Sequence, residues 1–393
     1  MDERSINEIE TKKGIWRPLF ITKYAIALLI IIGIFNTSPY GATLSWVLVP
    51  FSLTVIGTFL EKINLKMNRA MFFAFAFWVV CIVSTVLSPS VTLERDGLTS
   101  FLFVLWFSLI IGNYKTTSIS DFFIVLYVAV SLLVSCIIIY NWVNGIYYNE
   151  WFARSTLSVG GVQKDPNYVA AFLAPAPILL LLYGKYSGKD NLFTKKWLAW
   201  CLVAIVCVSL LLNGSRGGIL SALIAVCGFV FFSIKSTKKR IKTLIALIII
   251  ATIGVIVMIN VLPEQTIERL FFQSSGDTRS KLWSAAIMPF TNNPLIGEGL
   301  NSASKYSLEL AGNASHNMYI DILSGAGLLG AALYIMMIWD TGFRRKKHKI
   351  DIALACFALL MPQMFINGFN STSQWIPIIM LWLTSSFVSQ QDT

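Results

Sequence analysis

The sequence NASHNMYIDILSGAGLLG, residues 313–330, marks the point where a long polar segment ends and a long apolar run begins. His316, one of only two histidines in the chain, stands at this boundary. The polar segment starts at Leu262, directly after another long apolar run. Because an apolar run of about 20 residues can cross a membrane as a helix, this alternation predicts an all-α integral membrane protein.

The composition of the whole chain supports the same class. Of the 393 residues, 56% are hydrophobic and 13% are charged, whereas about 25% of residues are charged in an average soluble domain. The mean hydropathy is +0.69. The six cysteines all lie in apolar runs without a Cys-x-x-Cys pair, so disulfides and zinc sites are not expected. Mixed charges near the N-terminus and the lack of a small-residue cleavage site argue against a cleaved signal peptide.

About twelve apolar runs have the length of a membrane-spanning helix. They predict three regions: spans one to nine in residues 1–261, a large outer loop at 262–316, and the last three spans with a cytoplasmic C-terminus in 317–393. The predicted spans are residues 19–35, 42–60, 70–88, 97–112, 121–143, 167–183, 196–212, 217–234, 241–261, 317–338, 350–368 and 371–389.

The distribution of Lys and Arg predicts the orientation of these spans. If the N-terminus is cytoplasmic, 23 of the 31 basic residues fall on cytoplasmic segments, as the positive-inside rule requires. Both termini are then cytoplasmic, and the net charge of +11 reflects membrane orientation rather than binding of nucleic acid. The remaining basic residues fall on the outer side: Arg95, Arg154, Lys164, Arg216, Arg269, Arg279, Lys281 and Lys305.

The large outer loop is predicted to contain a short helix. Its apolar residues recur at helical spacing before an Asn-Asn-Pro sequence, and a Gly-Glu-Gly turn follows at 297–299. The apolar stripe consists of Leu282, Trp283, Ala286, Ile287 and Phe290.

Arg216 lies in Ser215-Arg216-Gly217-Gly218, which joins two predicted spans with almost no loop. A helix N-terminus and a guanidinium group both favour phosphate oxygens, so this position suits an anion site. An arginine that reaches lipid headgroups is the alternative interpretation. Arg279, at the start of the predicted loop helix, is either a solvated charge paired with Asp277 or a second cation of the same site.

His316 has Asn317 beside it and Asp321 about one turn further on. A neutral imidazole can take a proton from a hydroxyl group near pH 7. The alternative is a structural histidine at a helix start. At the outer end of span six, Asn167 is expected to cap the helix, and Lys164 and Asn167 are expected to line one outer pocket.

Taken together, these motifs resemble the O-antigen ligase and polymerase superfamily of bacterial envelope enzymes. The resemblance covers the C-terminal two-thirds of the chain. One departure is Gly325, nine residues after His316, where members of the family often have Glu; Asp321 is the only acid nearby. The motifs are Lys164-Asp165-Pro166-Asn167, Ser215-Arg216-Gly217-Gly218, Arg279 with Trp283, the residues Asn293-Pro294-Leu295-Ile296-Gly297-Glu298-Gly299, His316-Asn317-Met318-Tyr319, and Gly327-Leu328-Leu329-Gly330.

The resemblance implies a C-type glycosyltransferase fold in the bacterial cytoplasmic membrane, with its active site facing the periplasm or exterior. It implies transfer of an oligosaccharide from undecaprenyl pyrophosphate to a glycan or lipid acceptor, with inversion and without a metal or cofactor. Membrane lipids and a chain-length regulator are further expected partners. The expected catalytic residues are His316 as base and Arg216 and Arg279 on the diphosphate; the expected substrate-binding residues are Lys164, Asn167, Ser215, Asn317, Lys281 and Asp321.

Four interpretations remain open from the sequence. We favour a polymerase of O-antigen or capsule polysaccharide, because nothing in the outer loops is dedicated to a lipid A core. An O-antigen ligase, which transfers glycan to that core, is the first alternative. A transporter or flippase for lipid-linked sugar would require ionisable residues near the bilayer midplane, whereas the charges here cluster at the ends of spans. A non-catalytic envelope scaffold or sensor is the third alternative.

Overall fold

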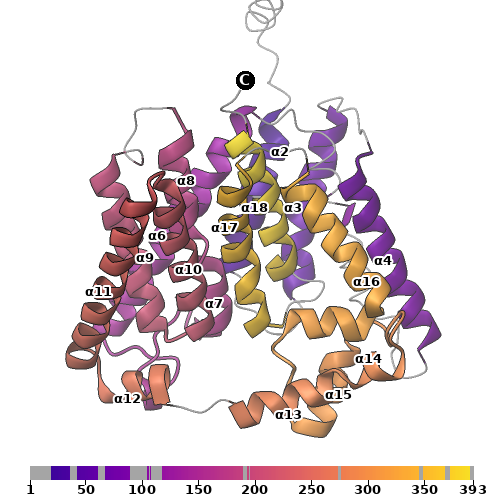
Figure 1. The fold of residues 1–393 in the computed structure, drawn as a ribbon. Coiled ribbons are helices and arrows are strands. Elements are labelled where there is room, and N and C mark those ends of the chain that lie inside the picture. Colours follow the sequence, from indigo (N-terminus) through magenta and orange to yellow (C-terminus); the bar gives the residue numbers. More distant parts are fainter. Residues whose placement is uncertain are drawn as a thin grey trace, which may run out of the picture.

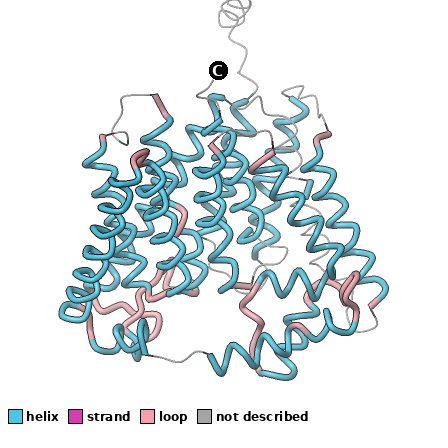
Figure 2. The backbone as a smooth tube through the Cα atoms, viewed as in Figure 1, coloured by secondary structure: helices cyan, strands magenta, loops and turns pink. Residues whose placement is uncertain are grey.

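The structure, a computed structural model, is a bundle of helices that run side by side, with shorter helices gathered at one end (Figure 1). Figure 2 shows loops between the helices at that end. The described residues contain one small sheet, in which β1 (Ser158–Val159) pairs with β2 (Val162–Gln163). The structure describes residues 19–35, 42–60, 67–88, 104–105, 107, 117–188, 193, 195–272, 276–344, 348–367 and 372–389.

The long helices lie where the apolar runs predict them, except that most of 97–112 lies outside the described residues. Within the described part of the chain, six segments are long and apolar enough to cross a membrane: 69–87, 120–143, 166–186, 196–213, 216–233 and 318–342. This confirms an all-α membrane protein, while the count of twelve spans stays a prediction. The helices of the bundle are α2 (Leu19–Phe35), α3 (Ala42–Leu60), α4 (Arg69–Leu87), α6 (Thr117–Val143), α7 (Pro166–Leu173), α8 (Ala176–Tyr186), α9 (Lys196–Asn213), α10 (Arg216–Ser233), α11 (Thr237–Val261), α16 (Met318–Gly342), α17 (Lys349–Leu360) and α18 (Thr372–Ser389).

Helix α18 lies at the centre of the bundle. Every side chain from Gln374 to Val388 is buried, because α18 packs against α2, α6, α8, α16 and α17. A helix that is apolar on all sides is stable only when other helices or lipid surround it. The largely apolar sequence of α18 is therefore explained by its position.

The predicted sixth span is broken into α7 and α8. Pro175 and Pro177 lie at the break, where a proline removes a backbone N–H and ends the preceding helix. Asn167 does not cap α7, so that prediction was wrong. Asp165 is the N-cap, and its carboxylate accepts a hydrogen bond from the Asn167 backbone N–H at 2.7 Å. Pro166 occupies the first helical position, so the N-cap is the residue before it, Asp165.

The predicted outer loop forms short helices across the end of the bundle opposite the C-terminus (Figure 1). The apolar stripe predicted a helix at the right place, since Leu282 and Ala286 are buried in α13. Ser324 of α16 holds that helix through a hydrogen bond to the Ala286 carbonyl oxygen at 2.6 Å. Helix α15 was not predicted. The elements are α12 (Glu264–Ile267), the π-helical turn η3 (Glu268–Phe272), α13 (Gly276–Ala286), α14 (Met288–Asn292) and α15 (Ser302–Ala311).

Helix α16 is kinked at Gly327, whose φ is +63°. The segment 294–299 completes the hydrogen bonds that the kink breaks: Leu328 and Leu329 donate to the carbonyls of Pro294 and Leu295, and residues 298 and 299 donate to those of 324 and 325. A Cβ at Gly327 would lie 2.3 Å from the Leu295 carbonyl carbon. The motif Asn293–Gly299 is therefore in contact with the motif Gly327–Gly330. Their irregular backbone forms hydrogen bonds within the protein, as it must in a membrane protein, because lipid offers no hydrogen-bonding groups.

Candidate functional site

Arg216 is the first residue of α10, directly after a tight turn. Gly214 ends α9 with φ +68°, a conformation that glycine adopts without strain. Ser215 is the N-cap of α10, and its hydroxyl donates to the side-chain oxygen of Asn167 at 3.2 Å. The chain therefore places a guanidinium group at a helix N-terminus, next to the start of α7, as the sequence predicts.

Phe365 lies between Gly217, the residue after Arg216, and Arg279. The ring lies directly on Gly217, because a Cβ at Gly217 would be 2.1 Å from its Cδ2 atom. The Arg279 guanidinium lies over the same ring, 5.2 Å from its centroid, in a cation–π contact. Phe365 ends the 3₁₀ helix η4 (Met361–Phe365) that follows α17. Residues from α10, α13 and η4 therefore meet at one place.

His316 lies in the loop between α15 and α16, with a left-handed φ of +48°. Its backbone N–H donates to the side-chain oxygen of Asn367 at 2.5 Å. The hydroxyl of Ser315 donates to the Asp321 carboxylate at 2.5 Å. Asn317 caps α16 and accepts from two backbone N–H groups at its start. These contacts hold the loop while, among the described residues, the imidazole makes no side-chain hydrogen bond.

Helix α13 brings Arg279 towards His316. The indole N–H of Trp283 donates to the Ser315 carbonyl at 3.0 Å, directly before the histidine. Arg279 lies four residues before Trp283, and residues at that spacing are neighbours on one face of a helix. Arg279 and the His316 loop are therefore held on the same side of α13.

Burial and neighbouring charges set the ionisation of this site. Burial lowers the pKa of His316 below its ordinary value, the Asp165 carboxylate opposes this effect, and Arg279 adds to it. Burial also lowers the pKa of Arg279, and the nearby Arg216 lowers it further. His316 is therefore mainly neutral at pH 7, the form that can accept a proton. Arg279 therefore lies near both His316, whose pKa it lowers, and Arg216, which lowers its own pKa.

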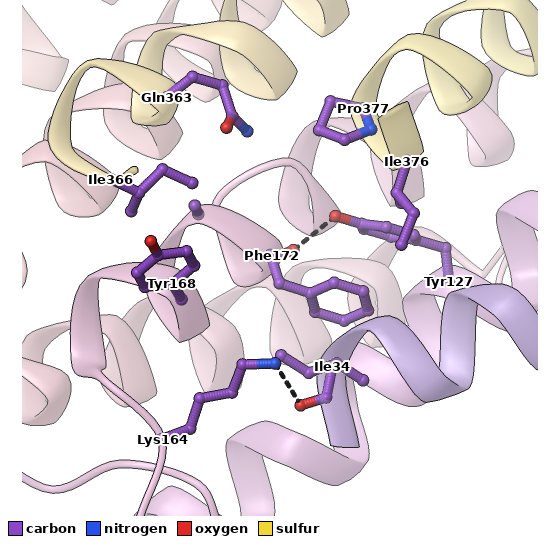
Figure 3. Close-up of a pocket in the computed structure, with 10 residues that line it drawn as sticks. Ile34, Tyr127, Lys164, Tyr168, Phe172, Gln363, Ile366, Ile376 and Pro377 are labelled. Carbon is purple, nitrogen blue, oxygen red and sulfur yellow. Dashed lines mark hydrogen bonds between the residues drawn. The ribbon is translucent and has the colours of Figure 1, made fainter. Parts of the chain in front are cut away.

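Lys164 and Asn167 lie in different surroundings. The Lys164 ammonium group donates to the Ile34 carbonyl at 2.8 Å, near the C-terminal end of α2 (Figure 3). It lines a small cavity of about 30 Å³ with Tyr168 and Gln363, room for about one water molecule. Burial lowers the pKa of Lys164 to about 8. Asn167, by contrast, bonds to Ser215 beside Arg216.

Two of the other predicted substrate-binding residues are accounted for by local contacts. Asn317 and Asp321 are buried and pair with backbone and with Ser315, respectively. Lys281 is exposed on α13, two residues from Arg279 and therefore on a different face of that helix. It lines a groove of about 440 Å³ with Met288 and Leu310.

Phe365, Asn367 and Arg154 were not predicted as site residues. Phe365 and Asn367 carry no charge and belong to no motif in the sequence, so only their tertiary contacts reveal them. Arg154 was noted only for its unexpected place on the outer side; its Nε donates to the Asn213 carbonyl at 3.0 Å. In the part of the chain that the structure describes, no three His, Cys, Asp or Glu side chains gather into a possible metal site.

The fold and site define a membrane protein with an arginine pair and a histidine at one end of a helical bundle. Residues 201–335 match the model of a family described as O-antigen ligase, and this range includes Arg216, Arg279 and His316. This match, over about a third of the chain, supports the resemblance to the O-antigen ligase and polymerase superfamily and an enzymatic role. A search of the curated proteins gave no match.

Proposed function

We propose that the protein is a membrane glycosyltransferase that polymerises oligosaccharide units carried on undecaprenyl pyrophosphate. The observation that carries this proposal is the grouping of Arg216, Arg279 and a neutral His316 at one end of the bundle. The orientation expected from the basic residues places this end on the outer face of the cytoplasmic membrane. The family match supports a lipid-linked glycan donor and a glycan or lipid acceptor.

The proposed reaction is a single displacement at the anomeric carbon of the donor sugar. The acceptor oxygen forms a bond to that carbon while the bond from the carbon to the diphosphate oxygen breaks. His316 takes the proton of the attacking hydroxyl group. Attack opposite the leaving group inverts the configuration at the anomeric carbon.

Arg216 and Arg279 bind the leaving diphosphate, whose negative charge grows as the bond breaks. Guanidinium groups form bidentate hydrogen bonds to phosphate oxygens, and donors aimed at developing charge lower the barrier most effectively. In this proposal the arginines replace the divalent cation that many phosphate-releasing enzymes use. Turnover should therefore persist in EDTA, and strict dependence on added Mg²⁺ or Mn²⁺ would contradict the metal-free mechanism.

Deletion of the gene followed by analysis of envelope polysaccharide tests the choice of acceptor. Loss of a polymerase leaves single repeat units on the acceptor, which is the result we expect. Loss of a ligase leaves long polymer on undecaprenyl pyrophosphate and would refute the polymerase assignment in favour of the ligase.

Turnover by the purified protein tests the class of function. Polymer formed from a lipid-linked oligosaccharide in detergent requires catalysis. A protein that moves this lipid across vesicles without forming any glycosidic bond is a transporter, and that result would overturn the proposal.

A further inference from the structure

Arg154 is a buried arginine beside the turn that leads to Arg216. Only 8% of the residue is exposed. Its Nε donates to the Asn213 carbonyl at 3.0 Å, and its Cγ lies 3.2 Å from the position that a Cβ at Gly214 would occupy. The side chain therefore packs against the junction of α9 and α10, where the absence of a side chain at Gly214 leaves room for it.

The backbone around Arg154 is tied to the same junction. Its carbonyl accepts a hydrogen bond from Tyr148 at 2.8 Å, and the N–H of Ser155 donates to the Leu212 carbonyl at 3.1 Å. The side chain of Asn213 donates in turn to the Ser155 carbonyl at 3.2 Å. A folded loop therefore fixes the guanidinium group in place, which lowers the entropy cost of binding a ligand.

One of the three nitrogen atoms of this guanidinium group lacks a fixed partner. Among the described residues, the Nη2 atom of Arg154 is buried and has no hydrogen-bond partner. A buried cationic donor without an acceptor is unfavourable, because its hydrogen bonds to water are lost and no protein hydrogen bond replaces them. The position therefore suits an acceptor that a ligand brings.

The charges around Arg154 indicate what kind of ligand this is. Burial lowers the pKa of Arg154, Asp165 and Tyr148 oppose that change, and Arg279 and Arg216 lower the pKa further. The guanidinium groups of Arg216 and Arg279 are thus near that of Arg154, and three cationic groups suit an anion with two negative charges better than an anion with one. A diphosphate esterified at both ends carries two ionised oxygens, whereas a phosphodiester carries one.

We propose that Arg154 is a third arginine of the anion site, whose Nη2 hydrogen-bonds the diphosphate that Arg216 and Arg279 also bind. Arg154 then makes the site prefer a diphosphate to a single phosphate. This role rests on the proposed function, because it assigns Arg154 to the donor of that same reaction.

Anion binding by the purified full chain tests this assignment. Calorimetry with inorganic pyrophosphate and with inorganic phosphate gives the ratio of their dissociation constants. Arg154→Gln should lower the preference for pyrophosphate by about tenfold or more, as expected for a lost hydrogen bond to a charged group. Arg240→Gln is a matched control, since the Nε of Arg240 also donates to a backbone carbonyl, that of Ile234, near the start of α11. It should leave the ratio unchanged.

The outcomes separate this inference from the proposed function. Wild-type protein without any preference for pyrophosphate refutes the diphosphate donor and the role of Arg154 with it. A wild-type preference that Arg154→Gln keeps in full refutes the role of Arg154 alone. If Arg154→Gln does not fold, Arg154→Lys retains the charge and can still donate to Asn213, but its single nitrogen cannot also occupy the position of Nη2. Its preference should also fall, and an unchanged ratio refutes the role.

Discussion

Gly217→Ala should strongly reduce the activity of the protein although it changes only a hydrogen into a methyl group. The new Cβ would lie 2.1 Å from Cδ2 and 2.4 Å from Cε2 of Phe365. Carbon atoms in contact are about 3.5 Å apart, so the ring must move by about 1.4 Å. Because Arg279 lies over this ring, its guanidinium group must move as well.

The size of this displacement sets the expected effect. A shift of about 1 Å in a positioned group can cost about 100-fold in rate, so we expect a loss of that order in kcat. Overpacking also costs about 1–3 kcal/mol of stability. Gly228→Ala in the same helix is the matched control, since its Cβ would come closest to Cδ2 of Leu354, at 2.6 Å. The end of a leucine can move away, so this variant should keep its activity.

The rate of polymer formation by each purified variant, normalised to the amount of folded protein, measures the loss of activity. Thermal melting measures the loss of stability. The double variant Gly217→Ala/Phe365→Leu should recover part of the activity, because a smaller side chain makes room for the methyl group. Equal rates for Gly217→Ala and Gly228→Ala would refute the argument that Phe365 positions Arg279 over α10.

Three further predictions concern charge and pH. Arg216→Lys keeps the positive charge but loses the bidentate fork, so kcat should fall by about tenfold or more; full activity in a steady-state assay would contradict bidentate binding. The rate should fall as pH drops through the pKa of His316, which lies below its ordinary 6.5, because protonation removes the base. Arg279→Gln removes a positive charge, so it should raise the pKa of His316 and move the acid limb of the pH–rate profile to higher pH. Asp165→Asn removes a negative charge, so it should lower this pKa and move the limb to lower pH. Shifts of the same sign in the two variants would contradict the electrostatic account.

The bundle helices were predictable because a membrane requires long apolar runs. The ends of α2 and α3 agree with the predicted spans 19–35 and 42–60, since polar residues bound both runs. Arg216 could be placed at a helix start for a similar reason: three glycines and a serine leave almost no loop between two apolar runs.

The tertiary contacts of the site could not be predicted in the same way. Phe365 and Gly217 are far apart in the sequence, and nothing in the sequence around either residue indicates that they are in contact. The cap of α7 was assigned to Asn167 rather than Asp165, because both residue types cap helices well. The kink of α16 at Gly327 depends on segment 294–299 supplying hydrogen bonds, which no local pattern encodes.

The most direct test of the central claim is the initial rate of polymer formation by purified wild-type protein and by His316→Ala, with an undecaprenyl-pyrophosphate-linked oligosaccharide as the only glycan. We predict that the wild type releases undecaprenyl pyrophosphate as polymer grows, while His316→Ala inserts in the membrane, binds pyrophosphate normally and forms no polymer. A His316→Ala protein that forms polymer at the wild-type rate would contradict the role of the histidine as the base.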